Sequence, residues 1–305
     1  MARTKYKKPF IKVIYPYLFI LPFAVLTLMF FILPAIYTII MAFTDMKESL
    51  KVHFIGLDNF TKVLSDPNLP MILLNSFKFC GFALLFTLLL AVLMAISTQY
   101  FLKGKISGTF YRVVWLIPSV MPSVVYVAFW KWFFDPTWDG FLNKLAKTLG
   151  ANQPIAWFNN FSMEIVIIAT VVASVSGSVI LLSAAINSIP EDLYKAAKVD
   201  GASEKSVIRK IILPTLKWPL MYITISSSIG YIASYFFIML LTSGGPLRRT
   251  TTISLYAYQQ AFDMRQYGYG ASISLIVVFF ALILTLVLIR LFDFDSMIQP
   301  PRIED

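Results

Sequence analysis

Long apolar runs alternate with short polar segments along the chain, and the runs have the length of membrane-spanning helices. A helix needs about 20 residues to cross the hydrocarbon core of a bilayer. Six runs reach that length: Tyr17–Phe43, Phe77–Phe101, Tyr111–Phe134, Ile165–Ile189, Leu220–Leu241 and Ile273–Phe292. None shows the alternation over about ten residues that a membrane β-strand requires. The pattern predicts an all-α integral membrane protein with six transmembrane helices.

The first run follows a basic segment, as the apolar core of a secretory signal peptide does. It is longer than the roughly 7–15 apolar residues of such a core, and no small-residue cleavage site follows it. We therefore interpret this run as a membrane helix.

The composition excludes a soluble protein. Hydrophobic residues make up 58% of the 305 residues and charged residues 14%, whereas a soluble domain has about 45–50% and about 25%. The net charge is +10, but the basic residues lie between apolar runs, so nucleic acid is not an expected partner. One cysteine, Cys80, and one histidine, His53, exclude an intrachain disulfide, a cysteine metal cluster and a histidine-rich metal site.

The distribution of Lys and Arg predicts the orientation, because cytoplasmic loops carry an excess of these residues. Most of them fall in the N-terminal tail, in the loops after the second and fourth runs, and in the C-terminal segment. Both termini are therefore predicted on the cytoplasmic side of the membrane. We expect one transmembrane domain, residues 1–305, with a basic cytoplasmic tail, residues 1–16.

The loop between the fourth and fifth runs, residues 190–218, begins with signals for a short helix. Pro190 predicts the end of the fourth membrane helix. Ser188 and Glu191 have the spacing of a capping box. A helix from there to about Lys198 is predicted.

The second half of this loop predicts a turn and another short helix. Glycine takes backbone conformations that other residues resist, so Asp200-Gly201 indicates a turn. Ser203 is placed to cap a second helix, which Leu213-Pro214 should close. Residues 190–218 are thus predicted as a helical hairpin on the cytoplasmic face.

The spacing within this hairpin resembles the EAA loop of bacterial ABC importer permeases. In that motif, three residues separate EAA from Gly, and nine more separate Gly from I-x-L-P. This chain matches every gap, with Lys195 in place of the Glu. The resemblance implies that the loop docks into a cytoplasmic ATPase through Glu191, Lys195, Ala196, Ala197, Asp200, Gly201, Ala202, Ile211, Leu213 and Pro214.

Other segments resemble the carbohydrate-uptake, maltose-type branch of these permeases. They are Phe54–Phe60, Asn75–Phe79, Trp130–Pro136, Leu240–Pro246 and Gly268–Ser274. The resemblance implies half of a translocation path, a second permease, two ATPase subunits, an external solute-binding protein and a carbohydrate substrate. The chain itself has no G-x-x-x-x-G-K-[ST] phosphate loop. ATP and magnesium are therefore expected on the partner ATPases, and this chain is not expected to be an enzyme.

Hydroxyl groups in the fifth run are candidates for contact with a sugar. Ser227, Tyr231 and Ser234 stand at i, i+4 and i+7, which places them on one helical stripe. With Ser174, they match positions near the sugar in maltose-type permeases. Small hydroxyl residues also let membrane helices pack closely, so packing remains the alternative for this set.

Two other functions compete with sugar import. An ion-coupled carrier working alone would need acidic residues near the centres of its helices, and the six runs have none there. Import of glycerol phosphate or of another polar solute would keep the protein an importer permease and change only its cargo. A phosphate cargo would favour Lys or Arg at the midplane, where the runs have none either.

Overall fold

The computed structural model describes residues 10–47, 52–102 and 106–292. Across these ranges the chain is helical, and the strand-like pairing is a single bridge between Thr44 and Phe54. The chain divides into two compact units, residues 1–65 with 259–275 and residues 66–258 with 276–305. The all-helical prediction is confirmed for the described residues, and the single permease domain stays a prediction.

The smaller unit contains the first apolar run. Its elements are α1 (Phe10–Thr27), the π-helical turn η1 (Leu28–Ile32), α2 (Leu33–Ala42), α3 (Asp58–Leu64), the π-helical turn η4 (Gln259–Asp263) and the start of α15 (Tyr267–Leu291). Asn59 on α3 is buried, and its amide donates to the carbonyl oxygens of Ala42 at 2.9 Å and Thr44 at 2.8 Å. This side chain therefore fixes α3 to the end of α2.

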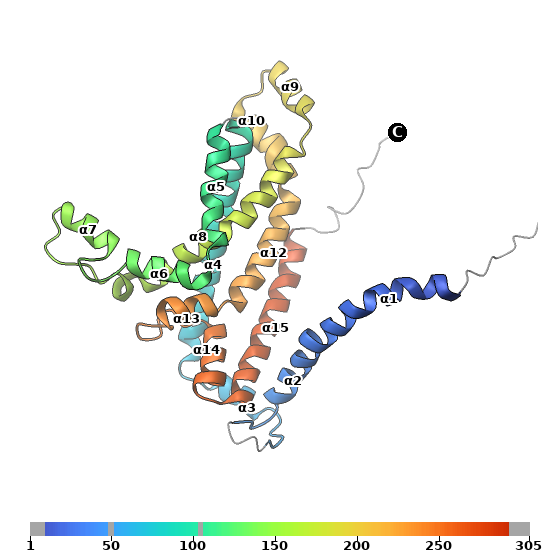
Figure 1. Cartoon of the computed structure of the whole chain (residues 1–305), viewed down its shortest axis with the longest axis vertical. Helices are drawn as coiled ribbons and strands as arrows, with labels where there is room; N and C mark the ends of the chain where they lie inside the picture. Colours follow the sequence, from blue (N-terminus) through green and yellow to red (C-terminus); the bar gives the residue numbers. More distant parts are fainter. Residues whose placement is uncertain (1–9, 48–51, 103–105, 293–305) are drawn as a thin grey trace, which may run out of the picture. The chain divides into compact units, whose positions relative to one another are not determined.

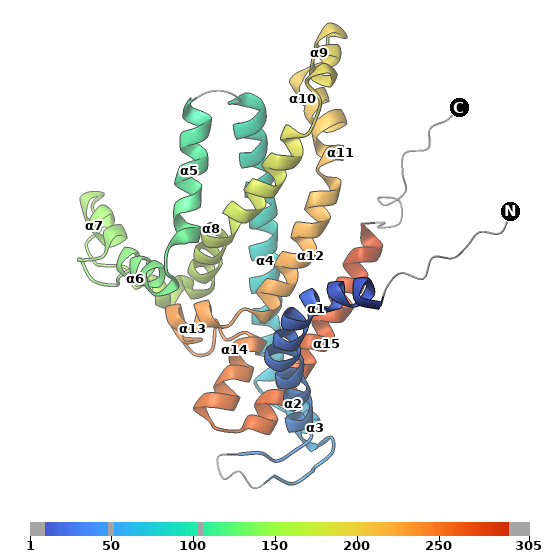
Figure 2. The ribbon, with the colours of Figure 1, turned by 45° about the vertical axis from the view of Figure 1, so that its right-hand side comes forward.

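The larger unit holds the other helices. In chain order they are α4 (Leu69–Ile96), η2 (Ser97–Phe101), α5 (Ile106–Val120), α6 (Ser123–Phe133), α7 (Phe141–Thr148), α8 (Trp157–Asn187), α9 (Glu191–Val199), α10 (Glu204–Val207), η3 (Ile208–Ile212), α11 (Leu213–Thr215), α12 (Lys217–Ala233), α13 (Phe236–Thr242) and α14 (Ile253–Tyr258). Helix α8 packs against α4, α5, α12 and α13 (Figures 1 and 2). Fully buried Ala91 on α4 and Ala169 on α8 allow close helix contact.

Four of the described helices are long and apolar enough to cross a membrane, at residues 17–42, 69–101, 157–187 and 267–291. Two further apolar stretches are broken helices. Residues 113–120 and 123–133 meet at 108°, and residues 217–233 and 236–242 meet at 52°. The structure thus has four candidate spans, or six if each bent pair is one span. The fifth run was predicted as a single helix and is a bent one instead. In the third run, Pro118 and Pro122 predict a break or a kink, and the structure has a bend there.

Prolines explain the sharper bend. Pro122 cannot donate a backbone hydrogen bond, and it stands before α6 with an extended ψ of 133°. Helix α6 starts anew there, because the Tyr126 amide donates to the Pro122 carbonyl oxygen at 3.0 Å. Such breaks are tolerated within a membrane where other helices or a cavity satisfy the freed groups.

Two other prolines leave their helices unbroken, because a π-helical turn precedes each Leu-Pro pair. The turn η1 ends at Ile32 before Leu33-Pro34, and η3 ends at Ile212 before Leu213-Pro214. The Leu213 amide donates to the Ile208 carbonyl, one residue farther back than in an α-helix. This wider turn accommodates a residue without an N–H. The second helix of the hairpin ends at Thr215, one residue beyond the closure predicted at Leu213-Pro214.

Candidate functional site

The loop between α8 and α12 folds into two short helices joined at Gly201. Helix α8 ends at Asn187, and α9 begins at Glu191 after Pro190. The predicted capping box is wrong, because Pro190 takes the N-cap position of α9. The Ser188 hydroxyl instead donates to the Ala185 carbonyl at 2.8 Å within the last turn of α8. Ser203 does cap α10, and its hydroxyl accepts from the Ser206 amide at 3.3 Å.

Gly201 takes a left-handed conformation at this turn, with φ of +71°. The Ala202 amide donates to the Ala197 carbonyl at 2.9 Å, and the Gly201 amide donates to the Lys198 carbonyl at 3.2 Å. This is the hydrogen-bond pattern of a Schellman motif, which favours glycine. A Cβ added at Gly201 would meet no atom within 4 Å. Glycine is therefore required here by conformation rather than by crowding.

The first helix of the hairpin is mostly exposed. Leu193 and Val199 are 51% and 86% exposed, and Ala196 is exposed beside them. Lys195 forms an ion pair of 3.0 Å with Asp192 on the same helix, and both side chains are open to solvent. An exposed pair of this kind adds at most about 1 kcal/mol. The exposed first helix of the hairpin thus carries small and apolar side chains among charged ones. Lys195, which stands in place of the Glu of the EAA motif, is held in a local ion pair.

The base of the hairpin is anchored in the helical bundle. Tyr100 on η2 packs against Tyr194 with ring centroids 5.7 Å apart and donates its hydroxyl to the Glu204 carboxylate. Ile212 is fully buried in an apolar cluster with Leu182 of α8. Ile211 packs on the same cluster, so it belongs to the base of the hairpin. Leu213 and Pro214 are exposed.

Three hydroxyl groups from three helices meet in the interior of the bundle. The Tyr231 hydroxyl of α12 lies 2.7 Å from Thr87 Oγ1 of α4 and 2.7 Å from Ser174 Oγ of α8. Tyr231 is 6% exposed, and its ring packs edge-on against Phe79. The structure therefore brings two predicted residues, Ser174 and Tyr231, together and adds Thr87. Periodicity could not identify Thr87, because it is 144 residues away from Tyr231.

The helical stripe predicted in the fifth run does not extend to Ser234, its last residue. Helix α12 ends at Ala233, and Ser234 is extended, with ψ of 121°. The bend to α13 follows directly. Ser227 and Ser234 are both half-buried, so they are more open than Tyr231.

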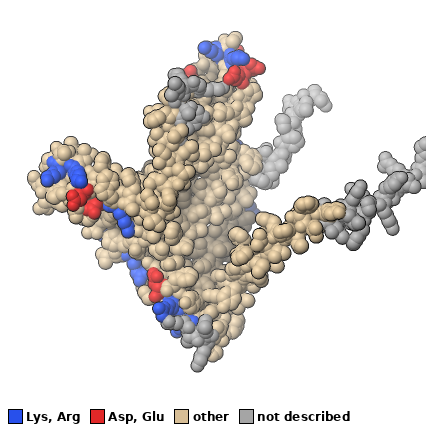
Figure 3. Space-filling model, in the orientation of Figure 1, with Lys and Arg blue, Asp and Glu red and all other residues tan. Residues whose placement is uncertain are grey.

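Charged side chains are concentrated at separate places on the larger unit. On the face in Figure 3, they gather over α9 and over α7, and the surface over the middle of α5 and α8 shows none. A cavity of about 690 Å³ lies near the starts of α4 and α8, and its lining includes Lys78, Glu164 and Arg249.

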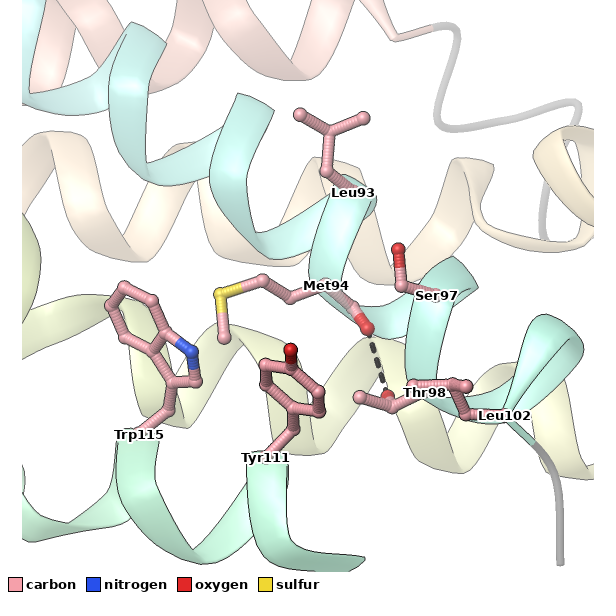
Figure 4. Close-up of a pocket in the computed structure, with 7 residues that line it drawn as sticks. All are labelled: Leu93, Met94, Ser97, Thr98, Leu102, Tyr111 and Trp115. Atoms are coloured by element: carbon pink, nitrogen blue, oxygen red, sulfur yellow. Dashed lines mark hydrogen bonds between the residues drawn. The ribbon is translucent and has the colours of Figure 1, made fainter. Parts of the chain in front are cut away.

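Another cavity, of about 330 Å³, lies between the end of α4 and the start of α5 (Figure 4). Trp115 and Tyr111 of α5 project side by side toward Met94 of α4. Among the described residues, no three His, Cys, Asp or Glu side chains are grouped as metal ligands.

Comparisons with known proteins agree with this architecture. Residues 87–295 match the family described as binding-protein-dependent transport system inner membrane component. The trehalose/maltose transport system permease protein MalF of Thermococcus litoralis is 31% identical, over 90% of this chain and 92% of its own length. The sn-glycerol-3-phosphate transport system permease protein UgpA of Escherichia coli O6:K15:H31 is 27% identical, over 90% and 92%.

A solved structure has the same fold. It is a bacterial ABC transporter involved in the import of the acidic polysaccharide alginate. A chain of that transporter superposes with a TM-score of 0.78 at 22% identity, and the match covers 93% of this chain and 96% of that one. The family match, the similar permeases and the apolar helices together identify the chain as a multi-pass membrane protein. The chain belongs to the family of inner membrane components of binding-protein-dependent transport systems, and it is a permease subunit of an ABC importer.

Proposed function

We propose that this permease carries a saccharide and couples to a cytoplasmic ATPase through the α9–α10 hairpin. The observation that carries the proposal is the hairpin itself, with small residues at an exposed Gly201 turn and a base anchored in the bundle. The relative named for trehalose and maltose transport supports the cargo. Neutral sugars also suit the half-buried hydroxyl groups of Ser227 and Ser234.

The topology proposed with it has six spans, each bent pair counting as one, and both termini in the cytoplasm. The chain is then a single permease domain, residues 1–305, with a cytoplasmic tail, residues 1–16, and a cytoplasmic coupling loop, residues 190–218. Residues 1–9 of the tail lie outside the described residues. The start of α5 and the hairpin lie at the same end of the larger unit (Figure 2), which supports this assignment.

The complete importer would contain a second permease, two ATPase subunits and an external solute-binding protein, in membrane lipid. ATP and magnesium would be bound by the ATPases, since this chain has no phosphate loop. ATP binding must favour one conformation of the assembly to move the permease. The contacts of Tyr100 with Tyr194 and Glu204 would carry a displacement of the hairpin to the end of α4.

We place the substrate path beside Ser174, Ser227, Tyr231 and Ser234. The half-buried hydroxyls of Ser227 and Ser234 would face the sugar. Tyr231 and Ser174 would form the wall behind them, because the Tyr231 hydroxyl is already bonded to its neighbours.

Glycerol phosphate is the second candidate cargo, and one observation favours it. Lys78 and Arg249 both line the 690 Å³ cavity, and a phosphate would pair with either cation. The carboxylate of Glu164 lines the same cavity and opposes an anion. Uptake of labelled glycerol 3-phosphate in competition with trehalose and maltose separates the two cargoes.

The coupling role is tested by Gly201→Val. A β-branched residue resists positive φ at a cost on the order of 1–3 kcal/mol, so the turn should open and its docking surface move. We expect the variant to reach the membrane at normal levels and to lose at least about nine-tenths of the co-purifying ATPase.

Gly150→Val is the matched control. Gly150 also has a positive φ, of +95°, and open space around it, but it lies after α7. This variant carries the same kind of strain and should keep the ATPase. Normal ATPase binding and transport by Gly201→Val would contradict the role given to the hairpin.

A further inference from the structure

A further cavity, with polar side chains in a largely apolar lining, lies on the hairpin side of the bundle, between η2, α5 and α8. Its volume is about 290 Å³. Three polar residues of α8 line it, Ser176, Ser183 and Asn187, at i, i+7 and i+11 on one stripe of the helix. Gln99 of η2 faces them across the cavity, and Trp115 of α5 forms another part of the wall. Three helical segments that pack together thus supply one polar lining.

Two polar groups of this lining have no partner in the described structure. Gln99 Nε2 and Ser183 Oγ are both buried and make no hydrogen bond, and each residue is 6% exposed. A buried polar group left unpaired destabilises the fold, and such groups are rare in native proteins. These side chains are therefore suited to a polar partner that enters the cavity.

The lining also defines the chemistry of that partner. No Lys, Arg, Asp or Glu is among the residues that line the cavity, so a neutral ligand fits better than an ion. Amide and hydroxyl groups pair with several hydroxyls at once. The indole of Trp115 and the apolar side chains of Leu116 and Ile180 provide a surface for C–H groups. Together, these features match one face of a sugar ring.

We propose that this cavity is a saccharide-binding site, separate from the Tyr231 cluster and next to the coupling hairpin. The proposal rests on the saccharide cargo argued above. Gln99 and Asn187 also line a neighbouring cavity of about 260 Å³ that reaches Tyr194 and Lys195 of α9. The Gln99 side chain thus borders both the proposed sugar site and the cavity that reaches the hairpin. The site would hold sugar at the end of the path where the ATPase docks.

Protection of a thiol in the cavity tests the site directly. Cys80 is the only cysteine of the chain, so Cys80→Ser with Ala184→Cys leaves a single thiol at an exposed position of the lining. The variant is assembled with its partner subunits in lipid nanodiscs. The rate at which a small hydrophilic methanethiosulfonate modifies this thiol is measured with and without maltose, trehalose or N,N′-diacetylchitobiose. At least one of these sugars should slow the reaction in a saturable manner.

Side-chain variants locate the contacts. Gln99→Leu and Ser183→Ala should each raise the half-protecting sugar concentration about fivefold, the factor carried by one neutral hydrogen bond. Ser178→Ala is the control, because Ser178 is a buried serine of the same helix that does not line the cavity. It should leave protection unchanged. A thiol at exposed Leu149, after α7 and outside both proposed sugar sites, should not be protected.

Uptake measured with the same variants reconstituted in proteoliposomes separates this proposal from the cargo. Transport of a sugar without protection at position 184 would overturn the site and leave the cargo intact; water would then fill the cavity. Equal protection in Gln99→Leu, Ser183→Ala and Ser178→Ala would overturn it as well. No transport of any of the three sugars, together with no protection, would overturn both proposals.

Discussion

At the scale of single residues, one phenol connects three helices. The Tyr231 hydroxyl bonds to Thr87, which is fully buried, and to Ser174. A ring enclosed in this way offers no free face to a sugar. Tyr231 therefore acts as a positioning residue, and the more open hydroxyls of Ser227 and Ser234 are the ones left to meet the substrate.

Tyr231→Phe separates this role from direct contact. The variant keeps the ring against Phe79 but removes two hydrogen bonds. We expect a loss of about 1–2 kcal/mol in the free energy of unfolding, with the KM of uptake changed less than twofold. A tenfold rise in KM at unchanged thermal stability would show that the phenol touches the sugar. Tyr231→Ala is less informative, because its cavity costs several kcal/mol, on the order of 3–5.

Another residue gives a test of the departure from the EAA motif. Lys195 is paired with Asp192 on its own helix, and both side chains are exposed. We expect Lys195→Ala to retain ATPase co-purification within twofold, because the pair contributes little. A loss as large as that of Gly201→Val would instead place Lys195 in contact with an acidic group of the ATPase.

At the scale of elements, the apolar pattern predicted where helices occur but not where they bend. The run Ile165–Ile189 lies within α8 apart from its last two residues, and the run Phe77–Phe101 lies within α4 and η2. The break at Pro122 has a sequence signal in the proline itself, which cannot donate a backbone hydrogen bond. The angle of 108° does not follow from that signal, because an apolar run has the same composition whether straight or folded back. The partner of Tyr231 was not predictable either, since Thr87 belongs to a distant run.

The hairpin was the best predicted part of the site, because its signals are local. Gly201 and Ser203 act on neighbouring residues, and both take the conformations expected of them. The end of the second helix was predicted to within one residue, since the helix ends at Thr215. The π-helical turn η3 before Leu213-Pro214 was not predicted, because such a turn has no clear sequence signal.

The contact between α15 and the end of α2 gives a test within the smaller unit. A Cβ added at Gly268 would overlap the Thr44 carbonyl oxygen and lie 3.1 Å from that of Met41. Neither backbone atom moves easily, so Gly268→Ala should lower the free energy of unfolding by at least about 1–3 kcal/mol. Thermal unfolding in detergent measures this change.

Gly81→Ala provides the comparison for that variant. Gly81 lies inside α4, and an added Cβ would meet no atom within 4 Å. Alanine favours helix over glycine by about 1 kcal/mol, so this variant should be as stable as the parent or slightly more stable. Equal behaviour of Gly268→Ala and Gly81→Ala would contradict the close approach at Thr44.

At the scale of the whole molecule, orientation is the next prediction. Val199 on the hairpin and Leu247 after α13 are 86% and 84% exposed, so cysteines there should be equally reactive. In a Cys80→Ser background, an impermeant thiol reagent added outside cells should label Leu247→Cys and not Val199→Cys. Labelling of Val199→Cys from outside would end the proposed topology and the coupling role together.

The central claim is that this chain moves a saccharide when an ATPase acts on its hairpin. The most direct measurement is uptake of labelled trehalose or maltose into proteoliposomes containing the complete importer, with its binding protein outside and ATP inside. We predict uptake that requires both ATP and the binding protein. Gly201→Val should abolish this uptake, and Gly150→Val should retain it. Sugar uptake that proceeds equally without ATP, or equally in both variants, would contradict the account.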